Sequence, residues 1–137
     1  MKTICKYISY NEATFSPTAV SNKIVNEPNS NQLIAMQLVG VRCFDPLREW
    51  YGKPIKVNSF FRNEALNKAV NGAKGSQHTK GQAIDLTGGS KEENKKLFEW
   101  AKDNLDFDQV INEKDYSWVH ISYVSREANR KQVLIIK

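Results

Sequence analysis

Two short stretches with strand-like alternation, residues 83–87 and 118–123, each carry an ionisable side chain near the centre: Asp85 in the first and His120 in the second. Successive side chains of a strand point to opposite faces of a sheet, so each stretch has one apolar face. If both strands belong to one sheet, burial of their apolar faces leaves Asp85 and His120 together above the other face. The apolar faces carry Ile84 and Leu86, and Val119, Ile121 and Tyr123; the opposite faces also carry Ala83 and Thr87, and Trp118 and Ser122.

The chain has only one other histidine, His78, seven residues before Asp85. Gly81 lies between them and gives the backbone the freedom to turn from the His78 segment into the strand. Two imidazoles and one carboxylate can hold a zinc ion and leave its fourth position open for water, as in a catalytic zinc site. Taken singly, a loop histidine, a strand-end carboxylate and a half-buried imidazole have ordinary structural explanations. Their spacing together predicts that His78, Asp85 and His120 bind zinc, which points to a hydrolase.

The composition is that of an ordinary globular protein. The 137 residues suit a single domain able to bury its own core, and 40% are hydrophobic and 26% charged. A net charge of +5 favours polyanionic partners such as cell-wall surfaces, although it fits a merely solubilising surface equally well. Two cysteines, Cys5 and Cys43, are too few and too far apart for a disulfide framework, and nothing in their spacing asks for a cysteine as a fourth metal ligand.

The N-terminal residues 1–12 have a basic start, but polar residues interrupt them before an apolar run of signal-peptide length forms. No stretch approaches the length of a transmembrane helix. We therefore expect synthesis in the cytoplasm without a signal peptide, or a periplasmic or extracellular protein whose leader has been removed.

Hydrophobic periodicity and turn residues divide the chain into a polar arm, residues 1–31, and a core, roughly residues 32–137. The arm is expected to be irregular, with one short helix or strand near Tyr7–Tyr10. In the core, the pattern predicts a main helix over 31–51 with a kink at Pro46 and a stop at Gly52. Two further helices are expected over 62–70 and 90–105, and strands over 54–60, 83–87, 107–111, 117–124 and 132–136.

Most of these strands fall in the second half of the chain, behind the long helix. Such an order favours an α+β domain with a largely antiparallel sheet and helices packed on one face. We expect one domain over residues 1–137 that acts as a monomer.

The motif Ser76-x-His78-x-x-Gly81-x-Ala83-x-Asp85, followed by W-V-H-I-S-Y around His120, resembles the zinc D-alanyl-D-alanine carboxypeptidases and their L-alanyl-D-glutamate endopeptidase relatives, which share a fold with hedgehog and lysostaphin-type proteins. Residues 57–72 are similar to the family's Ser-Gly-Tyr-Arg-Ser segment and the Leu-Asn that follows it. The resemblance covers roughly residues 33–124.

This resemblance implies His78, Asp85 and His120 as zinc ligands, Arg62 as the group that grips a substrate carboxylate or carbonyl, and Ser76 as a substrate contact. An arginine suits the first of these substrate roles because its planar fork offers paired donors to a carboxylate. The alternative for Arg62 is a surface salt bridge. The implied substrate is a peptidoglycan stem peptide.

The general base does not follow the family's best-known patterns. Several members carry an acidic residue three positions before the last histidine ligand and others a histidine two positions before it, whereas this chain has Ser117 and Trp118 there. Glu113 is therefore our first candidate for the base and Asp115 the second; the alternative is that both only solvate a turn. Trp118, on the same face as His120, either walls the substrate cleft or packs as an ordinary aromatic.

Together these features predict a zinc metallopeptidase that cleaves peptidoglycan stem peptides, as a D-Ala-D-Ala carboxypeptidase or an endopeptidase. An endolysin-like phage or prophage lysis enzyme, released to the cell wall by another route, fits the expected localisation, as does a bacterial wall-remodelling enzyme. The first alternative is a catalytically inactive, metal-stabilised domain that binds peptidoglycan or a protein. A basic nucleic-acid binder is disfavoured because the chain has no basic helix and no interleaved aromatic platform.

Overall fold

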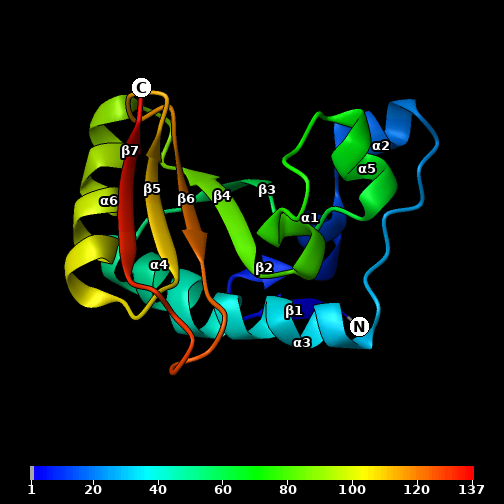
Figure 1. Cartoon of the computed structure of the whole chain (residues 1–137). Coiled ribbons are helices and arrows are strands. Elements are labelled where there is room, and N and C mark those ends of the chain that lie inside the picture. Colours follow the sequence, from blue (N-terminus) through cyan, green and yellow to red (C-terminus); the bar gives the residue numbers. More distant parts are fainter. Residues whose placement is uncertain (1) are drawn as a thin grey trace.

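The computed structural model describes residues 2–137 and has a five-stranded sheet at its centre (Figure 1). In spatial order the strands are β3 (Lys56–Ser59), β4 (Ala83–Thr87), β6 (Trp118–Ser122), β5 (Gln109–Glu113) and β7 (Gln132–Ile136). All neighbours pair antiparallel except β5 and β7, which are parallel. The parallel pair arises because the chain leaves β6 at the end of the sheet where β7 begins. The expected α+β fold with a largely antiparallel sheet is confirmed.

The predicted main helix is one nearly continuous rod made of α3 (Ser30–Val39), a π-helical turn (Gly40–Phe44) and α4 (Asp45–Tyr51). Pro46 lies in the first turn of α4, where its missing N–H costs least, and the wide π turn directly before it takes the place of the predicted kink. Gly52 ends the rod in the left-handed conformation, with φ 72°, as its position predicted.

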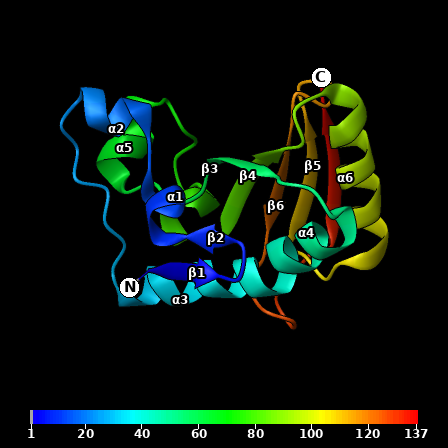
Figure 2. The ribbon, with the colours of Figure 1, turned by 180° about the vertical axis from the view of Figure 1, so that it is seen from behind.

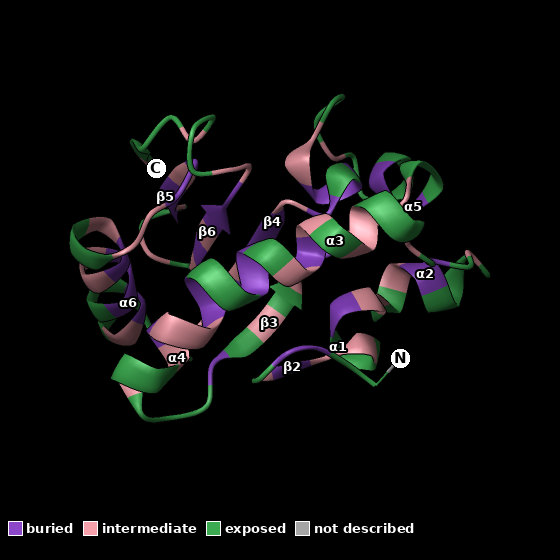
Figure 3. Ribbon diagram, turned by 90° about the horizontal axis from the view of Figure 1, so that it is seen from below, coloured by how far each residue is buried: buried purple, intermediate pink, exposed green. Residues whose placement is uncertain are grey.

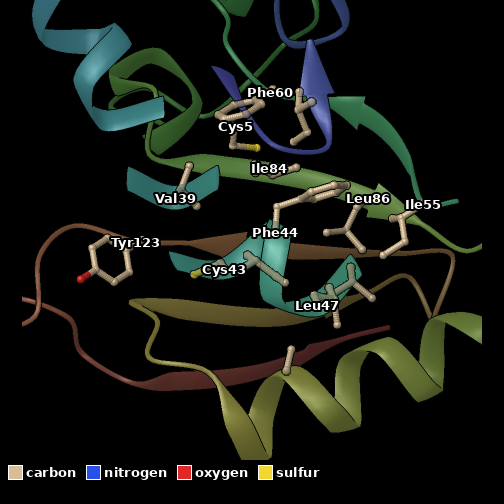
Figure 4. Close-up of a cluster of buried hydrophobic side chains, with 14 of the residues drawn as sticks. Cys5, Val39, Cys43, Phe44, Leu47, Ile55, Phe60, Ile84, Leu86 and Tyr123 are labelled. Atoms are coloured by element: carbon tan, nitrogen blue, oxygen red, sulfur yellow. The ribbon is translucent and has the colours of Figure 1, made fainter. Parts of the chain in front are cut away.

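The rod and the helix α6 (Lys91–Asn104) cover one face of the sheet, so the helices pack as expected. The alternating apolar side chains of β4, β5 and β6 point into this layer, where Phe44 and Leu47 of the rod meet Leu86 of β4 (Figure 4). In Figure 3 buried residues accordingly concentrate on these three strands. Because strand side chains alternate, the opposite face of the sheet is left for polar residues.

The N-terminal arm is more ordered than its composition suggests. In its described part, residues 2–31, it forms β1 (Thr3–Cys5), β2 (Ile8–Ser9), α1 (Tyr10–Thr14) and α2 (Pro17–Ser21). Figure 2 shows β1 and β2 lying beside α3, and Ile4 and Ile8 are buried in the common core. The prediction of an irregular arm is thus wrong, apart from the short element near Tyr7–Tyr10. The segment is polar overall, so the pattern did not reveal that Ile4 and Ile8 pack into the core.

Two short helices lie near the open face of the sheet: α5 (Glu64–Ala69) and a single 3-10 turn over Gln77–Lys80. The helix α5 sits within the predicted 62–70, whereas the 3-10 turn falls in a segment expected to be a loop. In the described residues, no helix is long and apolar enough to span a bilayer.

Candidate metal centre

Asp85 and His120 are direct partners in the register of β4 and β6, so their side chains share the open face of the sheet. The Asp85 Oδ1 atom lies 2.8 Å from His120 Nδ1. The prediction that the two strands would bring these residues together is confirmed, and the apolar alternation on the other face explains why. A slip of one residue in the pairing would turn one of these polar side chains into the core.

His78 approaches the same carboxylate from the 3-10 turn. Its Nε2 atom lies 3.1 Å from Asp85 Oδ2, and its side chain is 3% exposed. One potential ligand atom from each of His78, Asp85 and His120 can be chosen so that all lie within 4.8 Å of one another. The structure therefore gathers the three residues that the sequence singled out.

The hydrogen bonding of His78 fits a cation at this position. Its Nδ1 atom lies 2.7 Å from the backbone oxygen of Phe60, which can only accept, so Nδ1 must donate. In the neutral ring, Nε2 then carries a lone pair that faces the Asp85 carboxylate. Two acceptors at this distance need a positive species between them, either a proton or a metal ion. A lone pair aimed at a carboxylate, with the second ring nitrogen bonded to a carbonyl, is the usual preparation of a histidine metal ligand.

Asp85 stays ionised in this setting. Burial alone would raise the pKa of its carboxyl, but the hydrogen bonds with His120 and His78 outweigh burial and bring the pKa well below its ordinary range. Two imidazoles and one carboxylate match the ligand preferences of zinc, so the residues present fit that metal.

The helix α3 holds the His78 turn in place. Gly81, which ends the turn, has φ 74°, and a Cβ atom there would lie 2.5 Å from the backbone oxygen of Gln32 in α3. The Gln32 side chain also donates to the Thr79 oxygen at 3.0 Å. Inside the turn, Ser76 Oγ accepts from the His78 N–H at 3.2 Å. Gly81 is thus required both for its backbone conformation and for the close approach of α3.

A β-bulge lies beside the site, on the edge strand β3. Val57 pairs with Leu86 and Ser59 with Asp85, so Asn58 is an extra residue in this strand. Bulges of this kind redirect the residues that follow them. Here the chain goes on to Phe60, whose carbonyl oxygen accepts from His78, and to Arg62, whose N–H donates to the His78 oxygen at 3.2 Å.

An open pocket of about 480 Å³ adjoins the three residues, and it is lined by four more of the residues predicted from sequence: Arg62, Ser76, Glu113 and Trp118. Arg62 Nε is buried without a hydrogen-bond partner among the described residues, and burial lowers the pKa of its guanidinium, partly offset by Asp85. A half-buried cation with an unpartnered donor fits an anionic or carbonyl ligand. Ser76 also lines the pocket, and its Oγ accepts the hydrogen bond from the His78 N–H.

The two candidate bases occupy different environments. Glu113 is the last residue of β5, opposite Trp118 in the register, and lines the pocket. Burial raises the pKa of the Glu113 carboxyl, although the nearby His120 counteracts part of this. The Asp115 side chain is 74% exposed, lies 3.4 Å from Lys91 Nζ and is absent from the pocket wall. Of the two, Glu113 alone is placed to act on a ligand in the pocket.

The β5–β6 turn contains three consecutive left-handed residues, Lys114, Asp115 and Tyr116. This backbone conformation leaves Glu113 on the pocket wall and turns Asp115 away from it. The Asn94 side chain of α6 donates to the Tyr116 oxygen at 2.9 Å, and the Tyr116 N–H donates to the Asn112 side chain. Left-handed backbone is costly for residues other than glycine, so this turn depends on such outside support.

Sequence reasoning missed two contributors to the site. Lys114 lines the pocket, and its Nζ atom lies 5.6 Å from the ring centroid of Trp118, whose Nε1 is buried without a partner in the described part of the chain. A lysine next to Glu113 in a polar turn looks like an ordinary solvated residue. The Phe60 carbonyl, which orients His78, is a main-chain group and has no signature in the sequence at all.

Comparison with protein families gives a match to the peptidase M15 model over residues 6–122, which includes the N-terminal segment from β2 onward as well as the metal centre. None of the curated proteins compared with the chain matches it. Because the peptidase M15 model covers most of the sequence and all three residues of the metal centre, the chain belongs to the peptidase M15 family.

Proposed function

We propose that this chain is a zinc metallopeptidase that hydrolyses peptide bonds in peptidoglycan stem peptides, as a D-Ala-D-Ala carboxypeptidase or an endopeptidase. The observation that carries the proposal is the His78–Asp85–His120 cluster, which adjoins a pocket with a half-buried cation, Arg62, and a half-buried acid, Glu113. When bound, zinc supplies Lewis-acid chemistry, because it polarises a carbonyl oxygen and makes water more acidic. His78, Asp85 and His120 would hold it.

The remaining residues take the roles that their surroundings suit. Arg62 binds a carboxylate or carbonyl oxygen of the peptide through its unpartnered guanidinium donor. Glu113 accepts a proton from the attacking water and passes it to the leaving amine, and its raised pKa makes it a better proton acceptor near neutral pH than an ordinary glutamate. Trp118 and Lys114 form the wall beside it, and Ser76 contacts the peptide.

We propose that the protein acts as a monomer. The net charge of +5 suits a protein that works on an anionic cell wall. We propose that it reaches the wall after release, as phage or prophage lysis enzymes do, and that nucleic acid is not its partner.

Digestion of purified peptidoglycan tests this function. The zinc-loaded protein is expected to release D-alanine or peptides whose masses identify the cleaved bond, and excess chelator and the variant His120→Ala are both expected to abolish release. Zinc bound at one equivalent without any released peptide or D-alanine would contradict the peptidase and support the alternative, an inactive metal-stabilised domain that binds peptidoglycan or a protein.

A further inference from the structure

A second, smaller hollow lies next to the pocket of the metal centre. It has a volume of about 240 Å³ and is enclosed by the start of α2, the end of β3 and α5. Arg62 and Val70 line both hollows, so the two are neighbours that share these side chains. We call the smaller one the side pocket.

The walls of the side pocket are apolar or uncharged. Phe15 is 63% exposed and Val70 36% exposed, although both are large apolar side chains. Thr18 and Asn58 add polar groups without charge, and Arg62 is the only charged residue in the described lining. An exposed aromatic that walls a hollow with uncharged hydrogen-bonding groups suits an uncharged, partly apolar ligand.

The side pocket is held rigidly to the metal centre. The Asn26 side chain donates to the oxygens of Thr14 and Phe61, at 2.9 Å each, and its own oxygen accepts from the Asn63 N–H at 2.8 Å. These bonds tie the segment that carries Phe15 to the residues on both sides of Arg62. A wall fixed in this way loses little freedom when a ligand binds.

We propose that the side pocket is a second subsite for the same substrate, in which Phe15, Asn58 and Val70 bind an uncharged segment of the peptide at a distance from the bond that is cut. This inference rests on the proposed function. The side pocket is smaller than the roughly 300–1,000 Å³ of complete small-molecule sites, so it accommodates part of a longer ligand and not a ligand of its own. Because Arg62, the proposed peptide-binding cation, lines both hollows, we assign that longer ligand as the peptide.

Cleavage of a graded set of peptides tests the subsite. The set consists of a synthetic stem pentapeptide that ends in D-Ala-D-Ala and its versions shortened by one residue from either end. With the wild-type protein, kcat/KM is expected to fall roughly tenfold when the residue that occupies the side pocket is removed, as for the loss of a small apolar contact. Asn58→Trp, which fills the side pocket, and Phe15→Ser, which removes its wall, are expected to lower kcat/KM for the full peptide by a similar factor. In both variants the same truncation should then have no further effect.

Ile34→Ser is the matched control, because Ile34 is 56% exposed on α3 and lies outside both hollows. It should leave kcat/KM unchanged for every peptide. Equal zinc affinity in all four proteins would show that the metal centre is intact. The subsite is refuted if the wild type cleaves the peptides but both variants respond to truncation as it does. If the zinc-loaded wild type cleaves none of the peptides or peptidoglycan, the proposed function fails and the subsite with it.

Discussion

Asp85 and His120 face each other across β4 and β6, and the carboxylate of the first also reaches His78 on the neighbouring turn. The two oxygens of one carboxylate therefore face both imidazoles, at 2.8 Å from His120 Nδ1 and 3.1 Å from His78 Nε2. Because the sheet register places Asp85 and His120, only His78 depends on a turn. The sheet therefore fixes two residues of the metal centre, Asp85 and His120, whereas the position of His78 depends on contacts that hold its turn in place.

Asp85→Asn should remove the anionic ligand while it keeps the shape of the side chain. Losing a partner that merely orients a ligand costs roughly 10–100-fold in metal affinity, so the loss of this carboxylate should cost at least about 100-fold. Competition with a chelating dye measures the zinc affinity. Asp103→Asn, on the exposed side of α6 behind the sheet, is the control and should bind zinc like the wild type. Unchanged affinity in Asp85→Asn would remove Asp85 from the ligand set.

Glu113→Gln should retain zinc but lower kcat roughly 10²–10⁴-fold, the usual contribution of a general base. Asp115→Asn tests the second candidate and should keep full activity, because that side chain is exposed and paired with Lys91. Release of stem peptides, followed by mass spectrometry, gives both rates. Full activity in Glu113→Gln together with a loss in Asp115→Asn would exchange the two roles.

The same residue predicts the acid limb of the pH profile. Since burial raises the pKa of Glu113, the protonated and inactive form persists to higher pH than for an ordinary glutamate. As the pH falls from neutral, the midpoint of the decline in kcat/KM should therefore lie above the usual glutamate pKa of about 4.3. The measurement is kcat/KM between pH 4 and 8 with zinc in excess. A midpoint at or below about 4.3 would mean that burial does not tune this base.

The sequence was most informative where one face of a strand had to be buried. Alternation in β4 and β6 predicted the shared face of Asp85 and His120, since a slip of one residue in the pairing would turn one of these polar side chains into the core. It was least informative where backbone atoms or distant segments decide the outcome. The Phe60 carbonyl that orients His78 and the bulge at Asn58 depend on how β3 meets β4. Neither leaves a pattern in the local sequence.

The pocket wall shows the same division. Arg62 and Trp118 could be predicted from the motifs that contain them, whereas the choice between Glu113 and Asp115 required the turn geometry. Three left-handed residues in a row are improbable from composition alone, and they are supported by Asn94 of a helix that follows a different strand. Because such contacts join distant segments, the sequence could propose Glu113 and Asp115 as candidate bases but could not decide which of them lines the pocket.

Asp108 links the metal turn to the C-terminal loop, and this link should make stability depend on pH. Its buried carboxylate accepts from the Arg130 guanidinium at 2.6 and 3.0 Å and from the Gln77 side chain at 2.9 Å. The Arg130 hydrogen bond is the main reason that the pKa of Asp108 falls from 3.8 to about 2. This difference corresponds to roughly 2 kcal/mol, which solvent screening at the half-exposed Arg130 reduces to about 1–2 kcal/mol.

A lowered carboxyl pKa contributes stability that is fully present above the unfolded-state value and is lost as the pH falls toward the folded-state value. Asp108→Asn should therefore unfold in urea with about 1–2 kcal/mol less free energy than the wild type at pH 7, and the difference should shrink between pH 4 and pH 2. Comparing the two chains at each pH cancels the effect of metal release. Asp106→Asn, whose carboxylate lies 4.0 Å from Lys131, should differ little from the wild type at any pH. If the difference in unfolding free energy between Asp108→Asn and the wild type stays constant with pH, the ion pair is not the cause of that difference.

Gly81→Ala and Gly75→Ala separate backbone strain from packing in the segment that holds His78. Both glycines are left-handed, with φ 74° and 77°, so alanine costs roughly 1–2 kcal/mol at either position. A Cβ atom at residue 75 meets nothing within 4 Å, whereas at residue 81 it lies 2.5 Å from the Gln32 oxygen. Overpacking adds about 1–3 kcal/mol at residue 81 and should push the turn away from α3. We expect Gly75→Ala to lose about 1–2 kcal/mol of stability and no zinc affinity. Gly81→Ala should lose more stability than this and much of its zinc affinity. Urea unfolding and zinc titration of both variants would show this, and equal losses at the two positions would mean that α3 does not hold the His78 turn.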